Sequence, residues 1–349
     1  MNWAGERCAE RYGRSAMRPL LLPADDESLC LAAELLRRGG LVALPTETVY
    51  GLAADARSVA AVNRIFAAKG RPSDHPVIVH IADRGQLHEW AVEVPTWINA
   101  LLEQCWPGPL TVVLRRAPGV LDEVTGGLAT VGLRAPAHPV IQQVLRQFGG
   151  GLAAPSANRF GRVSPTTAQH VMADLADHLK PDCDAIIDGG PCAVGLESTI
   201  VDCTSDVPSI LRPGAITAER IEELVQRPVQ RVISGGSRAP GMLSAHYAPS
   251  AQVEVVQVDD VARRVDAHRG SRVGVLCATE LPLPPGVIRL DAPHLYTAEG
   301  LSPILYARLH DADRLGLDVL LVVAPDEVGM GVAVLDRLRR AATGSKRTG

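Results

Sequence analysis

Residues 41–76 read LVALPTETVYGLAADARSVAAVNRIFAAKGRPSDHP, and this stretch decides the fold. Its first four residues form an apolar run between Gly40 and Pro45, long enough for a buried strand and too short for a helix. The loop that follows, residues 46–50, carries hydroxyls and a carboxylate. We expect this loop just beyond the carboxyl end of the strand, where open α/β sheets bind their ligands.

A helix is expected after this loop. Ser58 suits the N-cap, and apolar residues recur at helical spacing over residues 59–66. Lys69-Gly70-Arg71-Pro72 then reads as the ordinary C-terminal stop of a helix. The same two cations, followed by His75, also suit an anion site beside the hydroxyl-rich loop. The two interpretations are compatible, and we expect Arg71 to be an exposed cation.

The composition limits the class of protein. The chain has 349 residues, of which 46% are hydrophobic and 3% aromatic, so its length predicts two domains or one large one with aliphatic cores. A net charge of −4 argues against a surface that binds nucleic acid everywhere, although it leaves room for one basic groove. Seven cysteines without a C-x-x-C pair argue against a disulfide framework or a thiolate zinc site.

The same features suggest a location. The N-terminal residues lack the apolar segment of a signal peptide, and no uncharged apolar run approaches membrane-spanning length. We therefore expect a cytoplasmic protein without a membrane partner. Residues 1–17 are polar and without pattern, and we expect a disordered or loosely ordered extension there.

Strands and helices alternate along residues 18–228, which predicts an α/β domain with a twisted mixed sheet. The expected strands are 77–81, 110–114, 130–133, 152–154, 185–187, 198–201 and 210–211, and the expected helices are 28–38, 97–105, 140–148 and one opening at Ser164 as N-cap with Pro165 in the first turn. His80 lies inside an expected strand and reads as a packed core histidine.

Residues 229–249 are rich in glycine, serine and proline and read as a linker. This linker is either a passive tether or, with Tyr247, a lid over the first domain. Residues 250–345 predict a smaller Rossmann-like domain. Its expected strands are 253–258, 272–277 and 319–323, and its expected helices are 260–268, 301–315 and 332–342. Because a G-x-G-x-x-G turn is missing, we do not expect dinucleotide binding there.

The candidate site consists of small polar and cationic residues at strand ends. No H-E-x-x-H, G-x-S-x-G or Walker A pattern occurs, and we expect no metal ligands from the protein. The strand-end residues are Thr46, Arg134, Ser156, Asn158, Ser198 and Arg212. Each alone can be a turn former, a cap or a surface charge. Together with Lys69 and Arg71 they predict a pocket for carboxylates or phosphates.

These residues lie in motifs that resemble those of the Sua5/YrdC family. The motifs are P-T-E-T-V-Y-G-L (45–52), K-x-R (69–71), T-V-G-x-R (130–134), S-x-N (156–158), S-P-T (164–166), E-S-T-I-V (197–201) and L-R-P-G (211–214). They follow the family's order and cover nearly all of residues 18–228. The second domain, preceded by H-Y-A-P at 246–249, resembles the longer Sua5 form.

The resemblance implies an L-threonylcarbamoyladenylate synthase, a nucleotidyltransferase. Such an enzyme makes threonylcarbamoyl-AMP and pyrophosphate from L-threonine, bicarbonate and ATP, for the N6-threonylcarbamoyladenosine (t6A) modification of tRNA position 37. Mg²⁺ would accompany ATP, held by the triphosphate and water. The implied partners are a downstream tRNA threonylcarbamoyltransferase and, weakly, tRNA or double-stranded RNA.

The resemblance also implies a role for each site residue. Lys69 and Arg71 would be catalytic. Threonine would be bound by Thr46, Arg71, His75, Arg134, Ser156 and Ser198. ATP would be bound by Lys69, Thr130, Asn158, Ser164, Arg212 and Tyr247.

Three alternatives stand beside this interpretation. A hydrogenase-maturation carbamoyltransferase shares the domain type, but it needs an acylphosphatase-like segment and zinc-finger cysteines, which this sequence lacks. A non-catalytic protein that binds double-stranded RNA or tRNA could use the same basic pocket, although the acidic composition and the scarcity of aromatic residues count against it. A regulatory nucleotide-binding protein would bind ATP without turnover.

Overall fold

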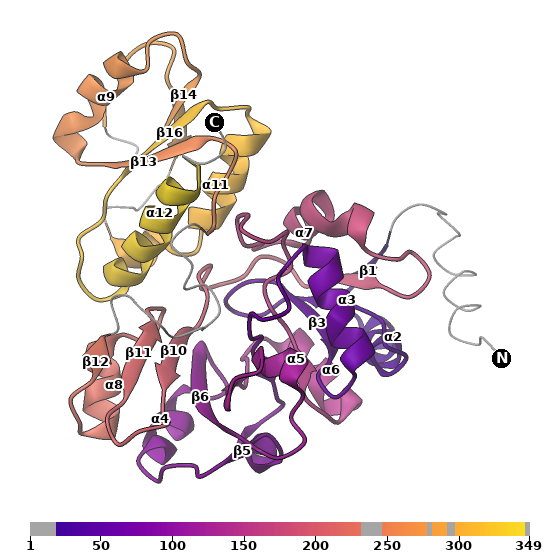
Figure 1. Ribbon diagram of the computed structural model, residues 1–349. Helices are drawn as coiled ribbons and strands as arrows, with labels where there is room; N and C mark the ends of the chain where they lie inside the picture. Colours follow the sequence, from indigo (N-terminus) through magenta and orange to yellow (C-terminus); the bar gives the residue numbers. More distant parts are fainter. Residues whose placement is uncertain (1–18, 232–245, 278–280, 292–296, 346–349) are drawn as a thin grey trace.

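The computed structural model describes residues 19–231, 246–277, 281–291 and 297–345. It contains two sheets, a large mixed one and a small parallel one, each with its own helices (Figure 1). The predicted fold class, an α/β domain with a mixed sheet plus a smaller Rossmann-like domain, is confirmed. The expected N-terminal extension and residues 232–245 of the expected linker lie outside the described residues.

The strands of the large sheet are β1 Leu20–Pro23, β2 Val42–Leu44, β3 Gly51–Asp55, β4 Val79–His80, β5 Ala91–Val92, β6 Leu110–Arg116, β7 Thr130–Arg134, β8 Leu152–Ala153, β9 Ala185–Asp188, β10 Thr199–Asp202, β11 Ser209–Arg212 and β12 Gln230–Arg231. They lie in the order β1-β9-β2-β3-β8-β4-β7-β6-β10-β11-β12, with β5 beside β6. The helices of this domain are α2 Asp26–Arg37, α3 Val59–Lys69, α4 Ile98–Cys105, α5 Asp122–Thr125, α6 Pro139–Phe148, α7 Ala168–Leu175 and α8 Ala218–Val225.

Helices cover both faces of this sheet. One apolar cluster joins α2 and α6 to β1, β2 and β9, and another joins α3 and α7 to the opposite side chains of β2, β3 and β9. Ile65 of α3 is fully buried, and burying such a side chain stabilises the fold by about 1.5–3 kcal/mol. Ser58 caps α3 by accepting from the Ala61 N–H, and Gly70 ends it in the left-handed conformation at φ 63°. The expected cap and stop of this helix are therefore both confirmed.

The pairing of four central strands places distant residues together. β6 runs parallel to β10 and antiparallel to β7, while β10 and β11 are antiparallel. The beginnings of β6 and β10 therefore lie beside the ends of β7 and β11. Arg134 ends β7 and Arg212 ends β11, so both guanidinium groups reach the same edge.

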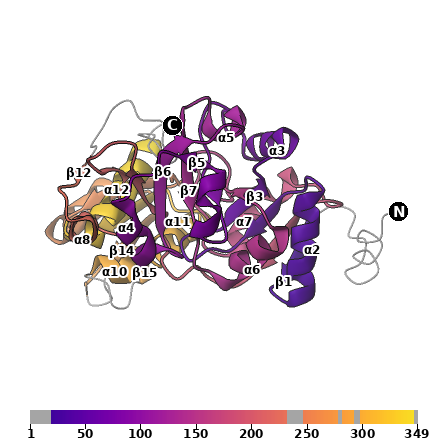
Figure 2. The same ribbon diagram turned by 90° about the horizontal axis from the view of Figure 1, so that it is seen from below.

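The second domain has the strands β13 Gln252–Val256, β14 Val273–Cys277, β15 Ile288–Asp291 and β16 Val319–Val323, all parallel and in the order β13-β16-β14-β15. Its helices are α9 Val261–Ala267, α10 Ala298–Leu301, α11 Leu305–Arg314 and α12 Met330–Ser345. Both views place α12 on the side of this domain that faces the large sheet (Figures 1 and 2). No described helix combines the length and apolarity that a membrane span requires.

Some expected elements were wrong. The helix expected from Ser164 begins at Ala168 with Thr167 as its N-cap, because the Ser164 hydroxyl bonds a carboxylate elsewhere. The helix expected over 301–315 is split into α10 and α11. The hairpin partner β3 was missed, since its sequence GLAAD is dominated by small residues.

Candidate functional site

A cavity, partly open to solvent, lies where these strand ends meet. Seven predicted site residues line it, namely Thr46, Arg71, Arg134, Ser156, Ser198, Arg212 and Tyr247. Six come from the first domain and Tyr247 comes from the segment before β13, so they span 202 positions, from 46 to 247. The sheet topology thus collects most of the predicted site at one place.

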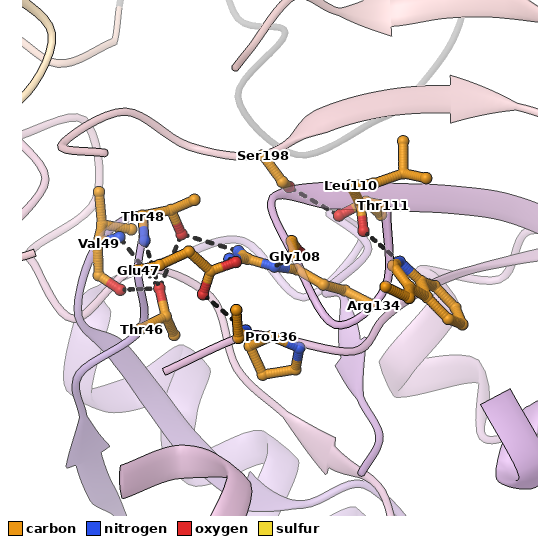
Figure 3. A network of polar contacts seen from close by, with 12 residues as sticks. Thr46, Glu47, Thr48, Val49, Gly108, Leu110, Thr111, Arg134, Pro136 and Ser198 are labelled. Carbon is orange, nitrogen blue, oxygen red and sulfur yellow. Dashed lines mark hydrogen bonds and ion pairs between the residues drawn. The ribbon is translucent and has the colours of Figure 1, made fainter. Parts of the chain in front are cut away.

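Arg134 is a buried cation of the cavity wall whose three guanidinium nitrogens all donate hydrogen bonds (Figure 3). Its Nη2 donates to Glu47 Oε1 at 2.7 Å, its Nη1 donates to Thr48 Oγ1 at 2.8 Å, and its Nε donates to the Gly108 carbonyl. Glu47 also accepts from the Ala137 N–H at 3.0 Å. The ion pair is nearly buried, with 5% and 12% of the two side chains exposed. The loop after β2 is therefore locked to the end of β7.

The Thr46 hydroxyl organises the same loop. Its Oγ1 lies 2.7 Å from Thr48 Oγ1, donates to the Val49 carbonyl, and accepts from the N–H groups of both residues. The loop is thus a compact hydroxyl turn that Figure 3 shows beside Arg134.

Ser198 and Arg212 form the opposite wall. Arg212 donates from Nε to the Ser198 carbonyl and from Nη2 to Ser198 Oγ, both at 3.1 Å, and Thr111 Oγ1 lies 2.7 Å from the same hydroxyl. The loop after β11 must pass very close to β10. A Cβ on Gly214 would lie 2.4 Å from the Thr199 nitrogen, so only glycine fits there.

Lys69 and Arg71 are held differently. Lys69 is buried, and its ammonium donates to the carbonyls of Ser156 and Asn158. Burial, and then the charge of Arg71, lower the pKa of Lys69 well below its usual value. Arg71 is 9% exposed, so the expectation of an exposed cation was wrong. Its Nη2 donates to the Pro76 carbonyl, while its Nε has no partner among the described residues.

The remaining predicted residues do not line the cavity. His75 packs edge-on against Phe160, the ring over which Arg71 also lies. Asn158 uses its amide nitrogen for the carbonyls of residues 159 and 162, and its Oδ1 has no partner among the described residues. Thr130 begins β7, at the opposite end of the strand from Arg134, and Ser164 lies behind the cavity wall.

Comparison with known proteins identifies the family. A family model described as "Telomere recombination" (Sua5, yciO and yrdC) matches residues 34–214, and one described as "Threonylcarbamoyl-AMP synthase, C-terminal domain" matches residues 216–343. The threonylcarbamoyl-AMP synthase of Pyrococcus abyssi is 42% identical over 329 residues, which cover 89% of this chain and 93% of that protein. The chain belongs to the Sua5 family of threonylcarbamoyl-AMP synthases.

Other relatives agree with this family. The threonylcarbamoyl-AMP synthase of Bacillus subtilis is 39% identical and covers 93% of this chain and 95% of its own length. The crystal structure of P. abyssi Sua5 complexed with L-threonine matches this Sua5-family chain with a TM-score of 0.84 at 38% identity, over 93% of this chain and 98% of the other. The family and activity predicted from the motifs are confirmed.

In this Sua5-family synthase, the segment that leads into the second domain completes the cavity. His246 and Tyr247 line it and are 6% and 1% exposed. Tyr247 has φ 62°, a conformation that is rare for a tyrosine and that surrounding contacts must hold. Its ring stacks on Tyr306 of α11 with centroids 5.6 Å apart. Burial, then nearby Glu197, raise the pKa of Tyr247 to about 12, so its hydroxyl stays protonated.

Glu197 binds the two domains together. Its Oε1 accepts from Ser164 Oγ at 2.6 Å, and its Oε2 accepts from Tyr306 OH at 2.8 Å and from Arg337 Nε at 2.9 Å. Burial alone would raise the pKa of Glu197, but the charges of Arg337 and Arg212 outweigh burial and lower it to about 2. The carboxylate is therefore ionised at neutral pH.

Several cavity residues were absent from the predicted site. They are Thr48, His80, Glu197 and His246, and Glu47, which pairs with Arg134 behind the lining, was also missed. His80 is buried as expected, yet it also faces the cavity, and burial followed by the charge of Arg134 lowers its pKa to about 3. Glu47 and Glu197 lie inside the quoted motifs. Each is the one carboxylate of its motif, and a carboxylate close to predicted cations could have indicated an ion pair. Within the described residues no three His, Cys, Asp or Glu side chains are placed to hold a metal ion.

Proposed function

We propose that the cavity makes threonylcarbamoyl-AMP from L-threonine, bicarbonate and ATP. The observation that carries this proposal is the convergence of three buried guanidinium groups, those of Arg71, Arg134 and Arg212, on one hydroxyl-lined cavity. Buried guanidinium groups form their strongest hydrogen bonds with carboxylates and phosphates, and both occur in these substrates. The P. abyssi structure with L-threonine supports the choice of amino acid.

We assign threonine to the side of the cavity near the loop after β2. Thr46, Arg134, Ser156 and Ser198 line it, with His75 and Arg71 next to them. The nucleotide belongs on the side of Lys69, Asn158, Ser164, Arg212 and Tyr247. Thr130 is also assigned to ATP by its motif, although its place at the start of β7 gives this assignment the least support.

The proposed reaction has two steps. The threonine amine forms a C–N bond with the carbon of bicarbonate, giving a carbamate and water. A carbamate oxygen then bonds the α-phosphorus of ATP as the bond to pyrophosphate breaks. Neither step needs a covalent intermediate with the protein, so positioning and charge neutralisation by Lys69 and Arg71 supply the catalysis.

Mg²⁺ is proposed to accompany ATP. A cation carried by the triphosphate and water fits the donor set here, because the cavity wall offers cations and hydroxyls with a single carboxylate that is already paired. Bound to ATP, it would neutralise phosphate charge as pyrophosphate leaves.

Pyrophosphate release with each substrate omitted in turn tests this function. We expect release only when L-threonine, bicarbonate and ATP are all present, together with Mg²⁺. Release that persists without threonine or bicarbonate would indicate simple ATP hydrolysis, and ATP binding without any turnover would favour a regulatory protein.

The cellular setting is proposed on the same basis. We place the protein in the cytoplasm, where its product passes to a tRNA threonylcarbamoyltransferase for t6A synthesis, with weak RNA binding at most. We further propose that the linker, residues 229–249, covers the cavity during the reaction. Its far end supports this, since Tyr247 lies in the wall and the Ala248 N–H donates to the Gly161 carbonyl.

A further inference from the structure

One buried arginine of the second domain reaches the cavity wall of the first. Arg337 lies on α12, and its side chain is completely buried. Its Nε donates to Glu197 Oε2, and its Nη1 donates to Asp336 on the same helix. Its Nη2 has no partner among the described residues, and its guanidinium lies 5.5 Å from the centroid of the Tyr247 ring.

Glu197 is the group that needs such a partner. It is the single carboxylate among the cavity-lining residues that the structure describes. It directly precedes Ser198, whose hydroxyl bonds Arg212, and it fixes the Ser164 hydroxyl. A carboxylate without its counter-ion at this position would repel a polyphosphate and would also lose its fixed geometry.

We infer that Arg337 is a positioning residue for the nucleotide side of the cavity. It pairs with Glu197 and so keeps that carboxylate turned toward Ser164 and away from the phosphates, and it supports the ring of Tyr247. This inference rests on the proposed placement of ATP. It gives the second domain a direct role in the reaction, through a side chain that does not itself touch the substrates.

The charges around Glu197 predict how the loss of Arg337 depends on pH. The groups that face the carboxylate are Arg337 from α12, Arg212 from β11, Tyr306 from α11, and His246 and Tyr247 from the segment before β13. Removing Arg337 takes away the stronger of the two opposing charges, so the pKa of Glu197 rises toward or above its ordinary value. Its protonation on acidification then removes the repulsion.

The test is Arg337→Met in the full-length chain, assayed by pyrophosphate release with threonine and bicarbonate saturating. We expect KM for ATP to rise about tenfold or more, while KM for threonine changes less than about threefold. Lowering the pH toward the raised pKa of Glu197 should narrow the gap in KM for ATP between variant and wild type. Arg339→Met is the matched control, since Arg339 lies on the same helix and pairs with Glu327 at the surface; it should behave as wild type.

A double variant separates positioning from simple folding. Glu197→Gln combined with Arg337→Met removes both charges and should recover part of the ATP affinity that Arg337→Met loses. Arg337→Lys keeps the charge, so its KM for ATP should lie between those of wild type and Arg337→Met. It replaces Arg337→Met in the test if the methionine variant does not fold. An unchanged KM for ATP in folded Arg337→Met or Arg337→Lys, or a double variant no better than the single, overturns the inference. Loss of the substrate requirement in the wild type would instead overturn the proposed function.

Discussion

The two sides of the cavity hold their cations in opposite ways. Arg134 is paired with Glu47 and bonds a hydroxyl and a carbonyl as well, so its charge is neutralised inside the protein. On the other side, Arg71 lines the cavity and Lys69 lies behind its wall, bonded to the Ser156 carbonyl. Both are buried, and within the described residues neither forms an ion pair with a carboxylate. Burial, with Arg212 nearby, lowers the pKa of Arg71 to about 10, which reflects the cost of keeping this charge.

This difference in ion pairing indicates which cations are available to bind a charged ligand. A buried charge without a counter-ion costs free energy, and proteins retain such groups at functional sites. We therefore expect a substrate anion to bind on the side of Lys69 and Arg71. On the other side, the ion pair and hydrogen bonds of Arg134 already hold the side chains in place, so that side is preorganised. The predictions below test this division, from the largest expected effect to the smallest.

The preorganised side should show the strongest selectivity between substrates. If its fixed hydroxyls bond the threonine hydroxyl, valine leaves them unpaired and should be used about 10⁴-fold less efficiently, whereas serine, which lacks only a methyl group, should lose about 10- to 200-fold. The measurement is kcat/KM for pyrophosphate release with each amino acid. Equal kcat/KM for valine and threonine would show that this side of the cavity does not bond the threonine hydroxyl.

Breaking the internal ion pair should damage the fold. Arg134→Ala leaves Glu47 buried without its partner, which should reduce the free energy of unfolding by about 3–5 kcal/mol. Denaturant unfolding of the full-length protein measures this change. Glu47→Gln combined with Arg134→Ala should recover part of the stability, and a double variant as unstable as the single would argue against charge as the cause.

Removing Arg71, which forms no ion pair among the described residues, should lower activity without lowering stability, the opposite of the effect expected for Arg134→Ala. Arg71→Ala should lower kcat/KM by about 10²–10³-fold because charge stabilisation of the reacting groups is lost. Its melting temperature should stay the same or rise, since a buried charge without an ion pair is removed. Arg57→Ala, at an exposed ion pair of the same domain, is the control. Normal turnover of Arg71→Ala would leave this residue with its helix-stop role alone.

The interface between the domains should add a pH dependence of stability. His170 of α7 and His310 of α11 stack with centroids 4.0 Å apart, and burial lowers the pKa of each to about 4. The unfolded chain takes up these protons near pH 6.5, so stability is complete above that pH and falls as the pH drops toward 4. Each histidine contributes at most about 1.4 kcal/mol per pH unit in that window.

His310→Phe should therefore flatten the decline in melting temperature between pH 6.5 and 4.5. His178→Phe, at an exposed position of the first domain, should leave the slope unchanged. Equal slopes in all three proteins would mean that the stacked pair does not keep a lowered pKa in the folded state, and would contradict this prediction.

The sequence predicted the fold class and seven of the residues that line the cavity. Strand-end residues such as Thr46 and Arg134 could be found because the end of a short apolar run shows where a buried strand ends. The carboxyl ends of strands then lie together at a sheet edge, where ligands bind. Ser164 was misassigned as a helix cap because a serine followed by a proline is also a typical helix start, and nothing local shows that its hydroxyl bonds Glu197.

The contacts between domains could not be predicted in the same way. Arg337 lies in an amphipathic helix among other arginines, and its sequence neighbours do not distinguish it from Arg339 or Arg340. Only the packing of α12 against the large sheet makes one of the three buried. The burial of Arg71 was missed for the same reason, because Phe160, the ring beneath it, is 89 positions away.

The ion pair of Glu197 and Arg337 also has a consequence for synthesis of the chain. The two residues are 140 positions apart, and a ribosome adds about 5–20 residues per second. Glu197 is therefore polymerised about 7–28 s before Arg337. During that interval Arg212 is the one of the two opposing arginines already present beside Glu197, so the carboxylate receives its full set of partners only when α12 has been made.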